Sequence, residues 1–151
     1  RSGNKKAAAF TLFFDMFKGF IAVFISSFID NDLVYLAILS VVFGHIFPVY
    51  LLFNGGKGVA TFLGALVSYS PVVGSLTFLA WITVFYFTRK SSVAGISAIV
   101  LSNLFLFVFC DDKSVKFSLL LLSIFILFKH SENIKRLLNK EEFSFQGRDK
   151  N

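Results

Sequence analysis

The feature that most limits the possible folds of this chain is a series of long apolar segments separated by short polar turns. A helix needs about 20 apolar residues, and at least about 17, to cross the hydrocarbon core of a bilayer. Of the 151 residues, 56% are hydrophobic and 16% are charged, whereas a soluble domain is typically about 25% charged. The sequence therefore predicts an integral membrane protein: an all-α, polytopic transmembrane helical bundle.

The apolar runs predict about six membrane crossings, two of which are short for a crossing. A polar turn over 111–116 is expected before the last run, and a charged, interfacial tail from residue 129 onward. With no repeat or second domain in the pattern, residues 1–151 are expected to form a single domain. The predicted runs cover residues 7–29, 33–53, 59–69, 72–88, 93–110 and 117–128, and His45 and Pro48 are expected to break the last third of the second run.

The positions of the basic residues predict the orientation in the membrane. With six crossings, twelve of the fifteen Lys and Arg residues lie on the side that carries both chain ends. Excess Lys and Arg marks the cytoplasmic side of a membrane protein. The net charge of +6 is explained by this topology, and no nucleic-acid partner is expected. The protein is therefore predicted to lie in the inner (cytoplasmic) membrane with its basic turns facing the cytoplasm.

One basic turn has the sequence Gly55-Gly56-Lys57-Gly58. Glycines allow backbone N–H groups to approach a ligand closely, and successive amides beside a lysine form a site for anions. If a helix starts at Val59, the amides of its first turn add to the same field. The pattern is typical of a phosphate cradle, and a tight turn between helices with a lysine reaching the membrane surface remains the alternative.

Two other polar clusters fall on the predicted cytoplasmic side. His130 and Asn133 are three residues apart and share a helix face, which suits either substrate orientation or helix packing. Glu132 and Arg136 have the spacing of a helix-stabilising ion pair. Ser92 belongs to a short polar turn that begins at Arg89, a residue expected to set topology.

The first apolar run contains two charges, Asp15 and Lys18. Charges inside a membrane are costly and mark polar networks or functional groups. Their adjacency and opposite signs favour a structural ion pair.

The three polar turns together predict a site that holds anions. Glycine amides, several cations and one imidazole on one membrane face suit a substrate that carries phosphate. The single cysteine, Cys110, and two distant histidines predict no metal site, and no cofactor is expected. A small membrane anion or phosphate transporter, or a channel subunit, is the alternative function, although the outer turns are acidic and no polar path leads to them from Lys57.

Two stretches resemble the acyl-phosphate-dependent glycerol-3-phosphate acyltransferases of bacteria, which are polytopic inner-membrane enzymes. One runs from Gly44-His45 through Pro48 and Asn54-Gly55-Gly56-Lys57-Gly58 to Thr61, and the other runs from His130 to Leu138. The resemblance implies transfer of a fatty acyl group from acyl phosphate to the sn-1 hydroxyl of glycerol 3-phosphate. The products would be lysophosphatidic acid and phosphate, in the first step of phospholipid synthesis. The protein is expected to be a monomer in contact with membrane lipid.

The resemblance also implies roles for individual residues. Phosphate would be held by Arg1, Lys57 and the amides of residues 55–58, and the substrates would be faced by His130, Asn133 and Ser92. The proton of the attacking hydroxyl would pass to His130 or to the acyl phosphate itself. Supporting positions are expected at His45, Thr61, Asp15, Lys18 and Glu132.

The resemblance further implies that an N-terminal helix precedes Arg1 in the full-length enzyme. The family's first motif, Ser-Gly-Asn-x-Gly-Ala-Thr-Asn-x-x-Arg, ends in an arginine that corresponds to Arg1. The family's seven helices would leave six in this chain, which agrees with the number expected from charge. The chain is thus expected to lack the first helix and most of that motif, so the segment by itself is expected to be inactive or weakly active.

Overall fold

A computed structural model describes residues 5–142, and all its elements are helical. The helices are α1 (Lys5–Ile29), α2 (Val34–Ile46), α3 (Val59–Tyr69), α4 (Pro71–Thr88), α5 (Ser91–Phe109), α6 (Lys113–Lys129) and α7 (Ser131–Leu138), with single 3-10 turns η1 (Asn31–Leu33) and η2 (Val49–Leu51). The predicted all-α class is confirmed.

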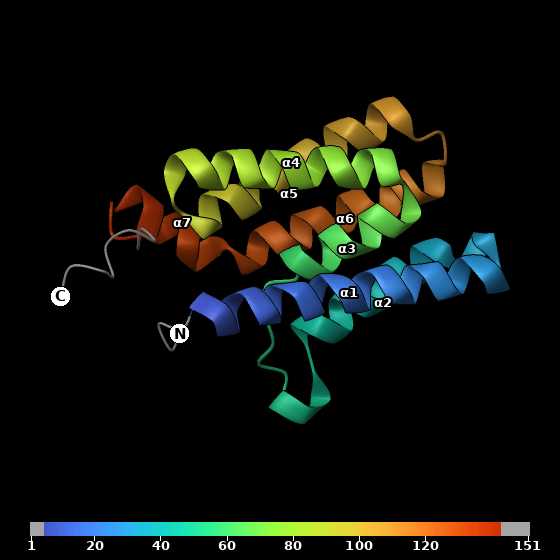
Figure 1. Ribbon diagram of the computed structural model, residues 1–151, viewed down its shortest axis with the longest axis horizontal. Coiled ribbons are helices and arrows are strands. Elements are labelled where there is room, and N and C mark those ends of the chain that lie inside the picture. The colour runs from blue at the N-terminus through green and yellow to red at the C-terminus, as the bar shows by residue number, and fades with distance from the viewer. Residues whose placement is uncertain (1–4, 143–151) are drawn as a thin grey trace.

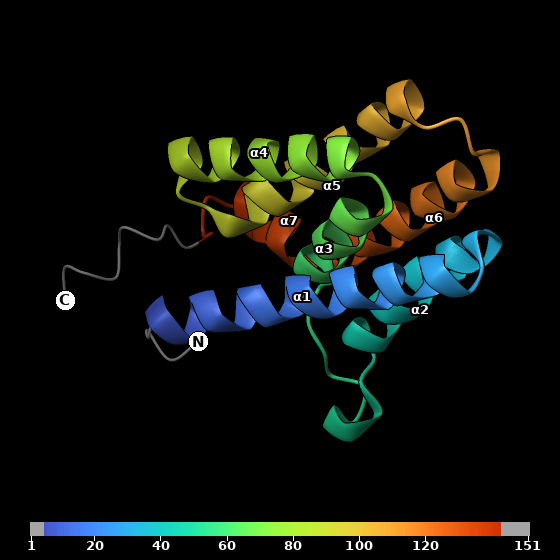
Figure 2. The ribbon, with the colours of Figure 1, turned by 45° about the vertical axis from the view of Figure 1, so that its right-hand side comes forward.

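The long helices form two antiparallel pairs around a short central helix. Figures 1 and 2 show α1 beside α2 and α4 beside α5, with α3 packed between α1 and α4. Helix α6 contacts both α5 and α2. Helix α7 follows α6 after a bend of 54° between the two helices. The turn before α3 and helix α7, which are distant in the sequence, are in contact through Lys57 and Asn133.

The helix surfaces match a lipid environment. Large apolar side chains are exposed along the outer faces, including Phe28 on α1 and Phe107 on α5, which are 75% and 74% exposed. Smaller aliphatic residues, such as Ile38, Leu66 and Ile99, fill the interior between the helices. In a bilayer the outer surface of such a bundle need not be polar, because lipid chains solvate the exposed phenyl rings.

Four helical segments of the described chain are long and apolar enough to span a membrane, and a fifth if α6 and α7 form one bent span. Helix α3 has 11 residues, which is short for a crossing. The expected membrane bundle is therefore confirmed, whereas the number of six crossings stays a prediction.

One predicted interruption is confirmed and one predicted boundary is wrong. The second run was expected to be broken in its last third by His45 and Pro48, and α2 ends at Ile46, before Pro48. Turn η2 follows, with Leu52 and Phe53 at positive φ. The expected turn over 111–116 is mostly helix. Helix α6 begins at Lys113, because the Asp112 carboxylate accepts hydrogen bonds from the backbone of Ser114 and Val115 at 2.8 and 3.0 Å.

Glycines bring three helices into backbone contact, as small residues do in membrane bundles. A Cβ on Gly64 of α3 would lie 1.9 Å from the Met16 carbonyl oxygen of α1, and one on Gly19 would lie 2.1 Å from the Thr61 carbonyl oxygen. Gly74 of α4 similarly meets the backbone of Val67 on α3. These contacts fix the position of α3 relative to α1 and α4.

We expect Gly64→Ala to destabilise the protein, because the added methyl group can be accommodated only if α1 and α3 separate. Overpacking of this kind typically costs about 1–3 kcal/mol. In thermal unfolding in detergent, Gly64→Ala should lower Tm by several degrees. Gly44→Ala is the control, since a Cβ there meets nothing within 4 Å. Equal Tm values for the two variants would contradict the close packing of α1 and α3.

Candidate active site

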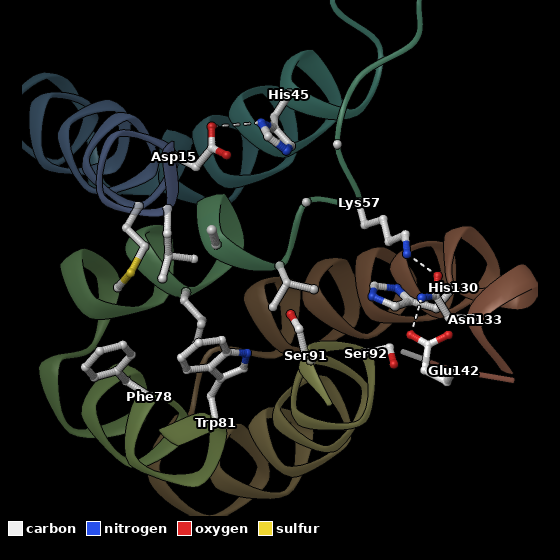
Figure 3. A pocket seen from close by; sticks show the side chains of 18 residues that line it. Asp15, His45, Lys57, Phe78, Trp81, Ser91, Ser92, His130, Asn133 and Glu142 are labelled. Carbon is white, nitrogen blue, oxygen red and sulfur yellow. Dashed lines mark hydrogen bonds and ion pairs between the residues drawn. The ribbon is translucent and has the colours of Figure 1, made fainter. Parts of the chain in front are cut away.

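A pocket of about 530 Å³ opens where α1, α2, α3, α4, α5 and α7 converge (Figure 3). It has polar groups at two ends and an apolar branch between α1 and α4. Its polar lining consists of Asp15, His45, Gly56, Lys57, Gly58, Ser91, Ser92, His130, Asn133 and Glu142. Most of the residues that the sequence singled out are thus brought together, although they are spread over more than one hundred positions of the chain.

Lys57 and Asn133 are in direct contact across this pocket. The Lys57 ammonium donates a hydrogen bond to the Asn133 side-chain oxygen. The Asn133 amide in turn donates to Glu142 Oε1 at 2.9 Å, and Arg136 Nε donates to Glu142 Oε2 at 3.0 Å. Asn133 is buried, so its carboxamide is held in one orientation by the lysine on one side and the carboxylate on the other.

His130 lies at the bend between α6 and α7 and is 3% exposed. Its Nδ1 atom is 2.9 Å from the Ile126 carbonyl oxygen. Because a carbonyl only accepts, Nδ1 carries the hydrogen, and Nε2 is the unprotonated nitrogen when the ring is neutral. A buried imidazole with this tautomer can accept a hydrogen bond or a proton through Nε2.

The glycine turn leads directly into α3. Gly58 is the N-cap residue of α3 with φ +89°, a conformation that favours glycine, and Gly56, Val59 and Ala60 line the pocket. The first amides of α3 therefore lie at the pocket wall beside Lys57, an arrangement that attracts anions. Helix α3 starts at Val59, as the sequence predicted.

Not all of the predicted residues reach the pocket. The Gly55 N–H donates to the Ile46 carbonyl oxygen at 3.2 Å, and Gly55 is not part of the pocket wall. Thr61 is fully buried and its hydroxyl has no hydrogen-bond partner among residues 5–142. Glu132 is exposed and lies outside the pocket, and Arg1 lies outside the described residues.

Ser92 and Arg89 differ in their relation to the site. Ser92 is buried at the pocket wall, and its hydroxyl has no partner of hydrogen-bond geometry in the described part of the chain. The Arg89 guanidinium instead lies over the Tyr86 ring, 5.1 Å from its centroid. The hydroxyl lies near the Glu142 carboxylate, so Ser92 can donate either to Glu142 or to a ligand.

The predicted pair of Asp15 and Lys18 is present, with Lys18 Nζ 2.5 Å from Asp15 Oδ1. A third group joins it, because Lys18 Nζ is also 2.5 Å from His45 Nδ1. Asp15 and His45 line the pocket, whereas Lys18, which contacts both, is not part of the pocket wall.

Glu142 is a pocket residue that the sequence did not single out. After α7, Lys140 adopts a left-handed conformation with φ 60°. The Glu141 N–H donates a hydrogen bond to the Arg136 carbonyl oxygen at 2.8 Å. This reversal returns the next residue to the pocket. Because no glycine marks the turn, the sequence carries no signal for it. The expected Glu132–Arg136 pair is loose at 4.0 Å, and Arg136 contacts Glu142 instead.

The environment of Glu142 favours its charged form. Burial would raise the pKa of this carboxyl, but the nearby Ser92 hydroxyl, the Asn133 amide and the Arg136 guanidinium outweigh it and lower the pKa below the ordinary 4.5. A carboxylate with a lowered pKa in the folded state stabilises the protein at neutral pH. That stability is lost as the pH falls through the lowered folded-state pKa.

We expect Glu142→Gln to be destabilised at neutral pH, because one oxygen of the carboxylate, and with it an acceptor for Asn133 or Arg136, is replaced by an NH₂ group. Unfolding temperatures measured from about pH 7 to about pH 3 should fall more steeply in the wild type than in Glu142→Gln, so that the two curves converge in acid. Parallel curves would show that Glu142 makes no pH-dependent contribution to stability.

Membrane-spanning helices around a glycine-lined pocket with both polar and apolar walls define an integral membrane protein with a candidate anion-binding site. The family model described as glycerol-3-phosphate acyltransferase matches residues 1–140. The glycerol-3-phosphate acyltransferase of Burkholderia pseudomallei (strain 1710b) is 44% identical over 147 residues, covering 94% of this chain and 72% of the relative. That of Wolbachia pipientis wMel is 40% identical, covering 96% and 76%.

Solved structures agree with these relatives. Crystal structures of PlsY (YgiH), an integral membrane glycerol 3-phosphate acyltransferase, match with 40% identity. The glycerol 3-phosphate form superposes with a TM-score of 0.87, covering 93% of this chain and 72% of that one, and the lysophosphatidic acid form with 0.86. The chain therefore belongs to the glycerol-3-phosphate acyltransferase family of integral membrane enzymes.

Proposed function

We propose that the protein transfers a fatty acyl group from acyl phosphate to the sn-1 hydroxyl of glycerol 3-phosphate. The observation that carries this proposal is the meeting of Lys57, Asn133 and His130 at one pocket that also has an apolar branch. PlsY, the similar solved protein, is described in glycerol 3-phosphate and lysophosphatidic acid forms, which are a substrate and a product of this reaction. The relatives support an acyltransferase and give no support to the transporter alternative.

The phosphate groups are bound, in this proposal, by the glycine turn and its neighbours. Lys57 supplies a full positive charge, and the amides of Gly56, Gly58 and the first turn of α3 supply donors. Ser92 adds a hydroxyl from α5. Arg1 is proposed as a second cation.

The acyl chain occupies the apolar branch of the pocket. Its walls are formed by Leu12 and Met16 of α1, Leu63 of α3, and Phe78 and Trp81 of α4. Because α1 and α4 are membrane helices, we propose that a lipid chain enters this branch sideways from the bilayer.

The chemistry requires little covalent work from the protein, because acyl phosphate is already activated. The hydroxyl oxygen of glycerol 3-phosphate forms a bond to the acyl carbonyl carbon, and the bond between that carbon and the phosphate oxygen breaks. Phosphate leaves with the bonding electrons, and Lys57 and the glycine amides stabilise its charge. The hydroxyl proton passes to His130 Nε2 or to a phosphate oxygen, and Asn133 orients the reactants.

We further propose that the protein acts as a monomer in the inner membrane, with the pocket open to the cytoplasm. The described helices share one core, which supports a single domain. The glycine turn and α7 carry Lys57, Lys135 and Arg136, and basic segments are retained on the cytoplasmic side.

A reconstituted assay tests the proposed donor. The full-length enzyme, with the helix expected to precede Arg1, is placed in lipid vesicles with radiolabelled glycerol 3-phosphate, and either acyl phosphate or acyl-CoA is added. We expect labelled lysophosphatidic acid and one equivalent of phosphate with acyl phosphate, and at most trace product with acyl-CoA. Product formation with acyl-CoA alone would overturn the proposed donor.

A further inference from the structure

The polar end of the pocket at α1 and α2 has no role in the reaction described above. It consists of Asp15 and Lys18 on α1 and His45 near the end of α2 (Figure 3 labels Asp15 and His45). The Lys18 ammonium contacts Asp15 Oδ1 and His45 Nδ1, each at 2.5 Å, and Asp15 Oδ1 is 3.3 Å from the same ring nitrogen. The three side chains therefore form one network.

The partners of His45 determine which of its ring nitrogens carries the hydrogen. A lysine ammonium only donates hydrogen bonds, so Nδ1 must accept from Lys18 and cannot itself be protonated. The hydrogen of the neutral ring is then on Nε2. This tautomer is opposite to that of His130, whose Nδ1 donates to a carbonyl.

The Nε2 atom of His45 faces the glycine turn. A Cβ added to Gly56 would lie 2.2 Å from this atom, so the ring edge rests directly against the Gly56 backbone. His45 also lines the pocket that Gly56, Lys57 and Gly58 share. No hydrogen bond from Nε2 to another group is present among residues 5–142, and the side chain of His45 is 12% exposed. A donor is thus directed at the site without a protein acceptor.

We propose that His45 is a further substrate-contacting residue, whose Nε2–H donates to an anionic oxygen of a phosphorylated substrate beside Gly56. Lys18 is a positioning residue that fixes the tautomer, and Asp15 holds the Lys18 ammonium in place. This inference rests on the proposed phosphate binding at the glycine turn. A neutral imidazole donor adds a directed hydrogen bond to the anion without adding another net charge beside Lys57.

The tautomer can be tested without enzymatic activity. Because the sequence has only two histidines, 15N-histidine labelling of the protein in lipid nanodiscs gives two imidazoles, which His130→Gln assigns. We expect opposite tautomers: Nε2–H at His45 and Nδ1–H at His130. An Nδ1–H or doubly protonated His45 ring, paired with Asp15, would overturn the proposal. Lys18→Met should abolish the preference at His45, whereas exposed Lys113→Met, on α6, should not.

Ligand titration tests the contact itself. Adding glycerol 3-phosphate or inorganic phosphate should move the His45 Nε2 resonance, and an unmoved resonance in the presence of bound phosphate would overturn the proposed contact. If neither histidine nor Lys57 responds and no acyl transfer occurs, the proposed function fails. An active enzyme with a silent His45 means that only the proposed role of His45 is wrong.

Two substitutions at His45 give the matched comparison in activity. The amide nitrogen of Gln can reach the position of Nε2, whereas that of Asn reaches only the position of Nδ1. We expect His45→Gln to stay within about five-fold of wild type and His45→Asn to lose about ten- to a hundred-fold, the range for a hydrogen bond to a charged group. Lys18→Arg, which retains a donor, should restore part of the loss in Lys18→Met. Equal activity of the Gln and Asn variants would contradict a donor role.

Discussion

Lys57→Ala is expected to remove most acyltransferase activity, with a loss of at least about a hundred-fold. The Lys57 ammonium contacts Asn133 and lies at the pocket wall with Gly56 and Gly58, where the leaving phosphate is proposed to bind. A donor directed at a developing charge in a desolvated site contributes more than a surface charge does. The measurement is the initial rate of lysophosphatidic acid formation by the full-length enzyme in vesicles at saturating concentrations of both substrates.

Lys135→Ala is the matched control for this prediction. Lys135 is an exposed lysine on α7, on the same predicted side of the membrane, and it is not part of the pocket wall. Its loss changes the net charge equally and should leave the rate within about two-fold of wild type. Activity of Lys57→Ala within a few-fold of wild type would overturn the assignment of the glycine turn as the phosphate cradle.

His130→Ala is expected to cost about a hundred-fold in rate, and Glu132→Gln less than about two-fold. His130 is buried at the pocket with Nε2 available, and groups that accept or position a proton typically contribute this much. The Glu132 side chain is 84% exposed and lies 4.0 Å from Arg136, so it resembles an ordinary surface ion pair.

The pH dependence of the rate separates two roles for His130. Burial lowers the pKa of His130 below its ordinary 6.5. If the imidazole accepts the proton, the wild-type rate should fall as the pH drops through this lowered pKa, and the residual rate of His130→Gln should not show that fall. If a phosphate oxygen accepts it, both profiles should have the same shape at different heights. Equal losses in His130→Ala and Glu132→Gln would argue against any direct role of the imidazole.

The main features of the fold could be predicted because they depend on composition and local signals. The apolar runs predict membrane helices, and the start of α3 at Val59 follows from the glycine before it. The break of the second run before Pro48 was also predicted, because proline is a local signal. The start of α6 was misjudged, since the helical segment at Lys113 is polar and the capping carboxylate of Asp112, not hydropathy, determines the boundary.

The site was predictable to the extent that its residues lie in compact motifs. Lys57, His130 and Asn133 were singled out from their local sequence, and the structure brings them to one pocket. Glu142 was not, because its contacts with Asn133 and Arg136 depend on a reversal of the chain at Lys140 that no glycine marks. His45 was expected to support the site, but its contact with Lys18 joins two helices and cannot be inferred from spacing along either one.

The proposed mechanism depends above all on the binding of a substrate phosphate by the glycine turn and Lys57. Solid-state NMR can measure the distance between the phosphorus of bound glycerol 3-phosphate and 15N-labelled lysine Nζ atoms, with Lys57→Arg identifying the signal of Lys57. We expect a distance of about 4 Å or less, because the hydrogen-bonded nitrogen and oxygen atoms are about 2.9 Å apart. If the lysine Nζ signals that respond to the bound phosphorus are the same in the wild type and in Lys57→Arg, Lys57 does not contact the phosphate. That result would contradict this binding mode.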